Sequence, residues 1–205
     1  MKLYVATRAP NPRRVQFFLA EKGIEVPEVT VDLAARENSG ETFLKLNPLG
    51  MVPVLELDDG TIICESVAIC RYFEALQPEP NLFGRTALEQ GLVEMWQRQV
   101  EMQLMQAVQF TFRHLHPAMA AREVPQVPQW GEVNKDKALA FLSRLDRRLE
   151  QSAYVALDRF TVADITALVT IDFMRLARLP VPADLAHLAR WRAEVSARPA
   201  AKAGM

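Results

Sequence analysis

The alternation of strand-like and helix-like patterns over the first 76 residues constrains the fold of this chain more than any other sequence feature. Residues 3–6 form a short apolar run, and residues 15–19 then place apolar side chains at helical spacing before Gly23. A second alternating run at residues 29–33 completes a strand–helix–strand unit. Because the strands of such a unit normally lie parallel, the chain is expected to begin with a small α/β sheet.

A hairpin and two further helices follow in the same region. Two strand-like runs flank Asp58-Asp59-Gly60, whose Asp-Gly step is a strong hairpin signal. A short helix is predicted at residues 42–46, because an Asn-Pro step follows and stops it. Ser66 is expected to cap a last helix with an apolar stripe that ends at Leu76. Residues 1–76 therefore read as a βαβαββα domain.

The pattern changes after this domain. Residues 77–85 hold two prolines and a glycine without periodicity, which is typical of a linker. No convincing strand follows, and capping boxes of the form T-x-x-E and T-x-x-D open two helices, at Thr86 and at Thr161. We therefore predict three parts: a domain at residues 1–76, a linker at 77–85 and an all-helical domain at 86–205.

Charge and hydropathy exclude several classes of function. The chain has 24 Lys and Arg residues against 25 Asp and Glu residues, a formal charge of −1, so generic nucleic-acid binding is not expected. No apolar run approaches the roughly 18 residues of a membrane span. Arg8 also interrupts any apolar signal segment near the start. We expect a cytoplasmic protein that binds neither nucleic acid nor a membrane.

The sequence does not favour a metal site. The spacing of Cys64 and Cys70 matches neither a redox C-x-x-C pair nor a zinc pattern. His114 and His116 would diverge on a helix, and His187 lies far away in the sequence. We therefore predict neither a bound metal nor a disulfide scaffold.

Two predicted helix starts in the first domain are candidate anion sites, at Asn11-Pro12 and at Glu65-Ser66, because a helix start presents unpaired N–H groups. The second is the more specific. The Glu65 carboxylate can hold an ammonium group, while Ser66 and its N–H hold the carboxylate of the same amino acid. In the alternative interpretation Ser66 only caps the helix, and Glu65 offsets the helix dipole.

Pro53 is a second informative position. Proline has no N–H for a β-ladder, so it belongs at the first residue of a strand or on an edge. In that place it leaves the backbone N–H and C=O of Val52 free to pair with an extended peptide. The alternative is an ordinary trans proline that opens an edge strand.

These features together resemble the cytosolic glutathione transferases of bacterial type. The resemblance is carried by the predicted element order, the string NPLGMVPVL at residues 47–55, the Glu65-Ser66 step, and FTVADI at residues 160–165. It implies a thioredoxin-like N-terminal domain, an all-helical C-terminal domain and a homodimer. It also implies a cis peptide bond before Pro53 and a transferase of the detoxification type, with glutathione as co-substrate and no further cofactor.

The resemblance also assigns roles to residues. It implies that the Val52 backbone, with Pro53, binds the cysteinyl unit of glutathione, and that Glu65 and Ser66 bind the γ-glutamyl end. The serine that such proteins often aim at the sulfur falls on Ala9, so the usual hydroxyl donor is absent.

The substitutes for that serine are Asn11, Thr7 and the N–H groups of the helix start, and we prefer Asn11. The alternatives are that Asn11 is consumed as an N-cap and that Thr7 is an ordinary loop hydroxyl. A lowered thiol pKa is the catalytic requirement, because a free thiol titrates near about 8.5.

By the same resemblance, a pocket for a small hydrophobic electrophile includes Met105, Phe110 and Arg113, which belong to a Met- and aromatic-rich stretch. The alternative is that the stripe is core packing and that Arg113 is salt-bridged. We predict a glutathione transferase. The alternatives are a non-catalytic binding protein of the same fold, or a glutathione-dependent disulfide or peroxide reductase.

Overall fold

The computed structural model describes residues 1–205, which form two compact units. One unit comprises Met1–Leu82 together with Arg198–Met205, and the other comprises Phe83–Ala197. The first contains the whole β-sheet, and the second is helical, so the predicted thioredoxin-like and all-helical architecture is confirmed. No helix combines the length and the apolar character needed to cross a bilayer.

The sheet of the first unit is a four-stranded mixed sheet of order β2-β1-β3-β4. Its strands are β1 (Lys2–Val5), β2 (Glu28–Thr30), β3 (Val54–Glu56) and β4 (Ile62–Cys64). β1 runs parallel to β2 and antiparallel to β3, and β3 and β4 form an antiparallel hairpin. Both the parallel strand–helix–strand unit and the hairpin were predicted correctly.

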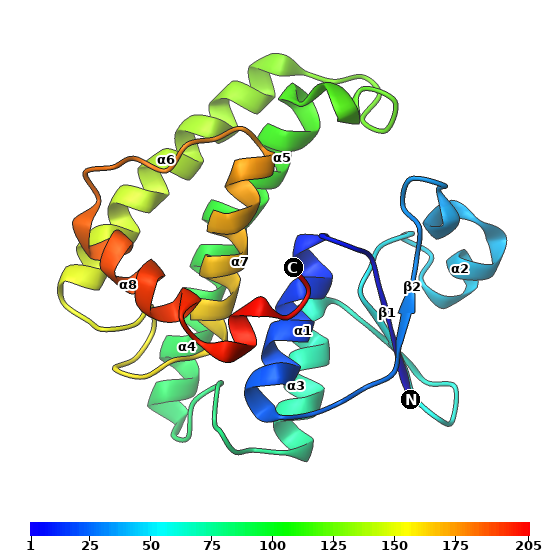
Figure 1. Ribbon diagram of the computed structural model, residues 1–205, viewed down its shortest axis with the longest axis horizontal. Helices are drawn as coiled ribbons and strands as arrows, with labels where there is room; N and C mark the ends of the chain where they lie inside the picture. Colours follow the sequence, from blue (N-terminus) through cyan, green and yellow to red (C-terminus); the bar gives the residue numbers. More distant parts are fainter. The chain divides into compact units, whose positions relative to one another are not determined.

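The helices of this unit cover both faces of the sheet. They are α1 (Pro10–Lys22), α2 (Glu41–Leu46) and α3 (Ser66–Leu76), with a 3₁₀ turn at Glu37–Ser39. Figure 1 shows α1 and α3 side by side, with α2 on the opposite side of the strands. Phe43 of α2 packs into a cluster with Tyr4 of β1 and Val54 of β3, on the face of the sheet that α2 covers. Leu3 and Val5, which alternate with Tyr4 along β1, are buried on the other face.

Two predicted helix caps were wrong. Ala9, not Asn11, is the N-cap residue of α1, and it makes no side-chain capping bond. Proline is tolerated in the first turn, so Pro10 is already helical and the helix begins one residue before Asn11. Ser66 is the first residue of α3 rather than its cap, and Glu65 holds the cap position with φ 69° and ψ 119°.

The second unit consists of helices joined by loops. They are α4 (Ala87–Gln99), a π-helical turn (Val100–Met105), α5 (Gln106–Leu115), a 3₁₀ turn (Pro117–Met119), α6 (Pro128–Glu150), α7 (Val162–Leu176) and α8 (Ala186–Ser196). Both predicted cap residues open helices here, but only the box at Thr161 is complete, because the Glu89 carboxylate accepts from the Arg85 N–H and not from that of Thr86. The Thr86 hydroxyl accepts from the Glu89 N–H at 3.2 Å, and Thr161 pairs reciprocally with Asp164.

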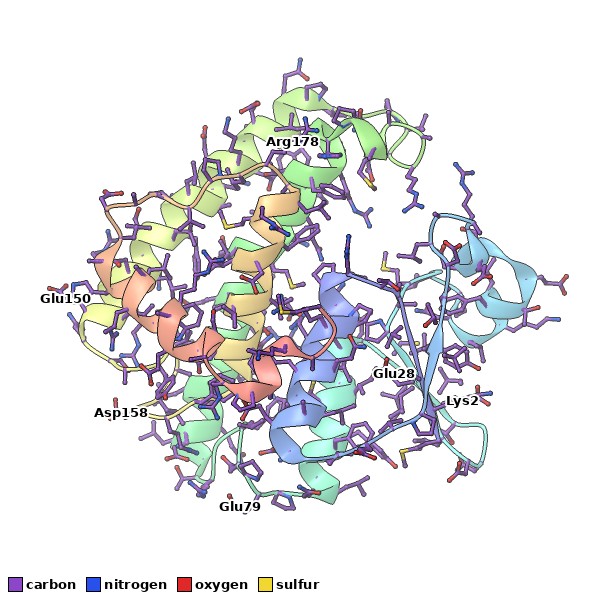
Figure 2. All side chains as sticks on the ribbon, in the orientation of Figure 1. Lys2, Glu28, Glu79, Glu150, Asp158 and Arg178 are labelled. Atoms are coloured by element: carbon purple, nitrogen blue, oxygen red, sulfur yellow. The ribbon has the colours of Figure 1, made fainter.

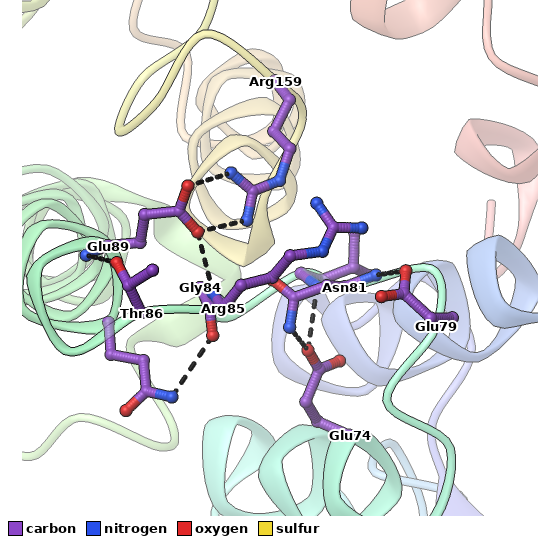
Figure 3. Close-up of polar contacts among 10 residues, drawn as sticks. Glu74, Glu79, Asn81, Gly84, Arg85, Thr86, Glu89 and Arg159 are labelled. Carbon is purple, nitrogen blue, oxygen red and sulfur yellow. Dashed lines mark hydrogen bonds and ion pairs between the residues drawn. The ribbon is translucent and has the colours of Figure 1, made fainter.

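Two carboxylates bind the predicted linker, one near its middle and one at its C-terminal end. Oε1 of Glu74 accepts hydrogen bonds from the Asn81 side chain and the Leu82 N–H, both at 2.9 Å (Figure 3). At the C-terminal end, Oε2 of Glu89 accepts from the Arg85 N–H at 2.7 Å and binds Arg159 at 2.8 Å. We retain the boundary at residues 77–85 as a proposal.

Candidate functional site

Strand register brings three segments to one edge of the sheet. Tyr4 of β1 lies opposite Val54 of β3, and Val54 lies opposite Cys64 of β4. Because β3 runs against both neighbours, the residues after β1, before β3 and after β4 share this edge. The predicted residues of the first domain gather there: Thr7, Asn11, Val52, Pro53, Glu65 and Ser66.

Val52 presents an unused backbone at this edge. Its peptide bond to Pro53 is cis, as the resemblance implied, which excludes the trans alternative. The Val52 side chain is buried in the α2-side cluster, but its backbone N–H and C=O form no hydrogen bond within the chain. Backbone groups in this state can pair with an added extended segment.

The loop that carries Val52 is held by two asparagines. Asn47 is buried; its Nδ2 donates to the Met51 carbonyl at 2.8 Å, and its Oδ1 accepts from the Leu49 N–H at 3.1 Å. Nδ2 of Asn38 donates to the Gly50 carbonyl at 2.7 Å. Gly50 has φ 62°, and a Cβ there would lie 2.9 Å from the Asn38 carbonyl oxygen, so this position requires glycine.

Sequence reasoning missed both asparagine roles. The Asn-Pro step indicated only a helix stop, and no local signal connects Asn38 to Gly50. Their effect is to fix the backbone on which Val52 sits before any ligand arrives, and a fixed binding backbone reduces the entropy that binding must overcome.

Glu65 and Ser66 form the second part of the edge. The positive φ of Glu65 is an unfavourable conformation for a non-glycine residue, and such strain is concentrated at functional sites. The Glu65 side chain is exposed and has no ion partner, whereas Ser66 is 4% exposed and its hydroxyl makes no hydrogen bond in the chain. The first amide of α3 that forms a hydrogen bond is that of Ile69, which donates to the Glu65 carbonyl at 3.0 Å. The amides before it are available to an anion.

The start of α1 offers a single backbone donor. Pro10 and Pro12 have no N–H, and the Arg13 N–H already donates to the Ala9 carbonyl at 3.2 Å. Asn11 therefore carries the only free amide of the first turn. The expectation of several N–H groups here was wrong, because the two prolines that favour the helix start also remove its donors.

The side chains of the two candidate donors differ. Asn11 is half-buried, and its Oδ1 receives a long contact of 3.5 Å from Nη1 of Arg14, whereas its Nδ2 donates no hydrogen bond within the chain. Asn11 is not consumed as an N-cap. Thr7 is exposed in the turn after β1 and makes no hydrogen bond, as its alternative interpretation held.

Neither cysteine is an activated nucleophile. Burial, followed by the nearby charge of Glu65, raises the pKa of Cys64, which packs against the same cluster as Ala9. Burial raises the pKa of Cys70 to about 12. A protein thiolate is therefore not available at neutral pH, so any thiolate chemistry at this edge requires a thiol brought by the substrate.

The residues predicted to line the electrophile pocket lie in the helical unit. Met105 is buried at the end of the π-helical turn. Phe110 of α5 is half-buried, and its ring centroid lies 5.9 Å from that of Trp130. Arg113 pairs with Glu123 at 3.3 Å, so the salt-bridged alternative applies to it. The pocket itself stays a prediction.

Comparisons with known proteins agree along the whole chain. Residues 9–76 match the glutathione S-transferase N-terminal domain family, and residues 104–199 match the C-terminal domain family. Glutathione S-transferase 2 of Saccharomyces cerevisiae is 38% identical over 205 residues, covering 98% of this chain and 88% of that protein.

Solved structures give the same picture. A glutathione S-transferase domain-containing protein of Marinobacter aquaeolei VT8 is 40% identical with a TM-score of 0.92, covering 98% of this chain and 99% of that one. A glutathione S-transferase described as class Gtt2, from Vibrio parahaemolyticus, is 41% identical with a TM-score of 0.87 and covers 100% and 96%.

Proposed function

The chain belongs to the glutathione S-transferase family, and we propose that it binds glutathione at the sheet edge and transfers it, as a thiolate, to a small hydrophobic electrophile. The observation that carries this proposal is the unused Val52 backbone beside the unpartnered Glu65 and Ser66. Glutathione contains an extended peptide and an amino-acid terminus, so one ligand satisfies both features.

Each part of the ligand has a chemical counterpart at this edge. The cysteinyl N–H and C=O pair with the backbone of Val52 as a short antiparallel strand. The γ-glutamyl carboxylate accepts from the Ser66 hydroxyl and the first amides of α3, and its ammonium group pairs with the Glu65 carboxylate. These contacts place the ligand sulfur toward the start of α1.

The thiolate is stabilised at the start of α1 without a serine. The Asn11 amide N–H, the Asn11 side-chain NH₂ and the positive end of the helix dipole are the groups available there. Every 1.36 kcal/mol, approximately, of preference for the ionised sulfur lowers the thiol pKa by one unit. We assign Asn11 as the donor and leave Thr7 as the weaker candidate.

The electrophile is proposed to be apolar. Phe110 and the exposed Trp130 offer aromatic surface with little hydrogen-bond specificity. Met105 is buried and Arg113 is paired with Glu123, so these two are the weaker members of the proposed pocket. A cytoplasmic homodimer with a role in detoxification remains part of this proposal.

The Glu65→Gln variant tests the glutamyl contact. We expect its affinity for S-hexyl-glutathione to fall about 10- to 150-fold, the scale of one charged hydrogen bond, because the ammonium group loses its anion. Isothermal titration calorimetry measures the change. Glu25→Gln is the matched control, since Glu25 is exposed in the loop before β2, away from this edge. Equal affinities for wild type and Glu65→Gln would contradict the assignment.

The Asn11→Ala variant tests the thiolate donor. We expect the pKa of the bound glutathione thiol to rise by about one unit, because the ionised sulfur loses one hydrogen bond while the backbone amide stays. Ultraviolet absorbance of the thiolate against pH gives this pKa. Thr7→Ala should leave it unchanged, and the reverse result would transfer the role to Thr7.

A further inference from the structure

The last residues of the chain return to the first unit and lie along α1. The segment Arg198–Met205 includes a 3₁₀ turn, η4 (Pro199–Lys202), which Figure 1 shows beside α1. Arg198 forms a bidentate pair with Glu21, with Nε and Nη2 each 2.7 Å from a carboxylate oxygen. The Glu21 side chain is only 9% exposed, so this is not an ordinary surface ion pair.

A second contact lies nearer the start of α1. Nη2 of Arg13 donates to the Ala201 carbonyl at 3.1 Å, and both residues are buried. Arg13 follows Asn11 by two residues, and its own N–H closes the first turn onto Ala9. The segment is therefore attached to the turn of α1 that carries the proposed thiolate donor.

A third contact lies between these two. Gly204 has φ 69°, and a Cβ there would collide with Oε1 of Gln16 and lie 3.0 Å from its Cδ. Gln16 could move aside only by giving up its bonds to Glu28 on β2, because its Nε2 donates to both carboxylate oxygens, at 2.9 and 3.0 Å (Glu28 is labelled in Figure 2). The segment Arg198–Met205 therefore contacts α1 from its first turn to its last.

The start of α1 lacks two of the usual polar restraints of a helix start. Its cap residue, Ala9, provides no side-chain hydrogen bond, and its two prolines remove backbone donors. The orientation of the first turn therefore depends on side-chain packing and on the contacts that hold the helix from outside.

We propose that residues 198–205 act as a strap that positions α1, and through it the Asn11 donor, with Arg198 and Arg13 as positioning residues. This rests on the proposed function. The strap contacts neither Val52 nor α3 by any of these bonds, so it should affect the sulfur end of glutathione and not the glutamyl end. Loosening it should raise the thiol pKa and lower kcat, with KM for glutathione nearly unchanged.

The test uses Arg198→Ala in the 205-residue chain, with two readouts. We expect the pKa of bound glutathione to rise by about half a unit or more, while the Kd of S-hexyl-glutathione changes by less than about threefold. The double variant Glu21→Arg/Arg198→Glu, which restores opposite charges, should recover the wild-type pKa. Gly204→Ala, which keeps every charge but displaces the segment from Gln16, should reproduce the effect of Arg198→Ala.

Arg192→Ala is the matched control. It removes an arginine of similar exposure from its pair with Asp172, at 3.0 Å, in the helical unit. Both Arg198→Ala and Arg192→Ala remove an ion pair and should shift the unfolding transition. Only Arg198→Ala should change the pKa of the bound glutathione thiol. An unchanged pKa in Arg198→Ala, or an equal change in Arg192→Ala, overturns the strap.

Amide hydrogen exchange separates this inference from the proposed function. Arg198→Ala should accelerate exchange in the first turns of α1, with or without a ligand. If wild type binds no glutathione, the proposed function fails, and accelerated exchange still supports the positioning of α1. Unchanged exchange contradicts the strap whatever the ligand does.

Discussion

An Asp164→Ala variant should lose about 4 kcal/mol or more of its unfolding free energy, because three buried N–H donors lose their acceptor and each such loss costs about 1–3 kcal/mol. Oδ1 of Asp164 accepts from the Val155 N–H and from Nε1 of Trp191, both at 2.9 Å. Oδ2 accepts from the N–H and hydroxyl of Thr161, at 2.9 and 3.0 Å. Asp164 and Trp191 are completely buried.

One carboxylate thus joins the start of α7, the preceding loop and α8. Burial raises the pKa of Asp164 to about 6, against the effect of the donors that surround it, so the group is ionised at neutral pH and accepts all four bonds. Total stabilities of proteins are about 5–15 kcal/mol, so the predicted loss is a large fraction of the whole.

Urea unfolding of wild type and variant measures this loss. Asp136→Ala is the control, because Asp136 is exposed on α6 and its replacement should leave the transition within experimental error. If Asp164→Ala unfolds at the same urea concentration as the control, the carboxylate does not hold these segments together.

This site shows what the sequence could and could not predict. The contact between Thr161 and Asp164 was predictable, because a capping box is formed by residues three positions apart. The Trp191 contact was not, since it joins residues 27 positions apart, and no local pattern specifies such a pair. The same holds for Arg198 and Glu21, 177 positions apart.

The candidate site divides in a similar way. The resemblance to the family placed Val52, Glu65 and Ser66 in one site, and the hairpin register brings Val54 opposite Cys64, so that the residues just outside this pair lie at the same edge. The state of Asn11 was not predicted, although Pro10 and Pro12 were visible in the sequence. Asparagine and proline are both common at helix starts, and only the backbone angles decide which residue is the cap.

A Lys22→Met variant should lose about 3–5 kcal/mol of unfolding free energy, because breaking a buried ion pair leaves an uncompensated charge. The Lys22 side chain is 0% exposed, and its Nζ lies 2.7 Å from Oε2 of Glu74. The same ammonium donates to the carbonyls of Gln77 at 2.7 Å and Pro80 at 2.9 Å. It therefore joins the end of α1 to α3 and to the chain that leaves the first unit.

The double variant Lys22→Met/Glu74→Gln separates charge from packing. The amide introduced by Glu74→Gln would retain an acceptor oxygen for the Asn81 and Leu82 donors that Oε1 of Glu74 now serves, but it would carry no buried charge. We expect the double variant to recover most of the unfolding free energy that Lys22→Met loses, because replacing both members of a buried ion pair leaves no uncompensated charge.

Urea unfolding of the four proteins in this cycle decides between two origins of the stability. If the double variant is as unstable as Lys22→Met, the loss comes from the carbonyls of Gln77 and Pro80, whose donor is absent in both. If Lys22→Met itself lies within about 1 kcal/mol of wild type, the pair behaves like an exposed one. A double variant as unstable as Lys22→Met would mean that the linker carbonyls of Gln77 and Pro80 need the Lys22 ammonium as their donor. The cycle therefore also tests whether the end of α1 anchors the predicted domain boundary.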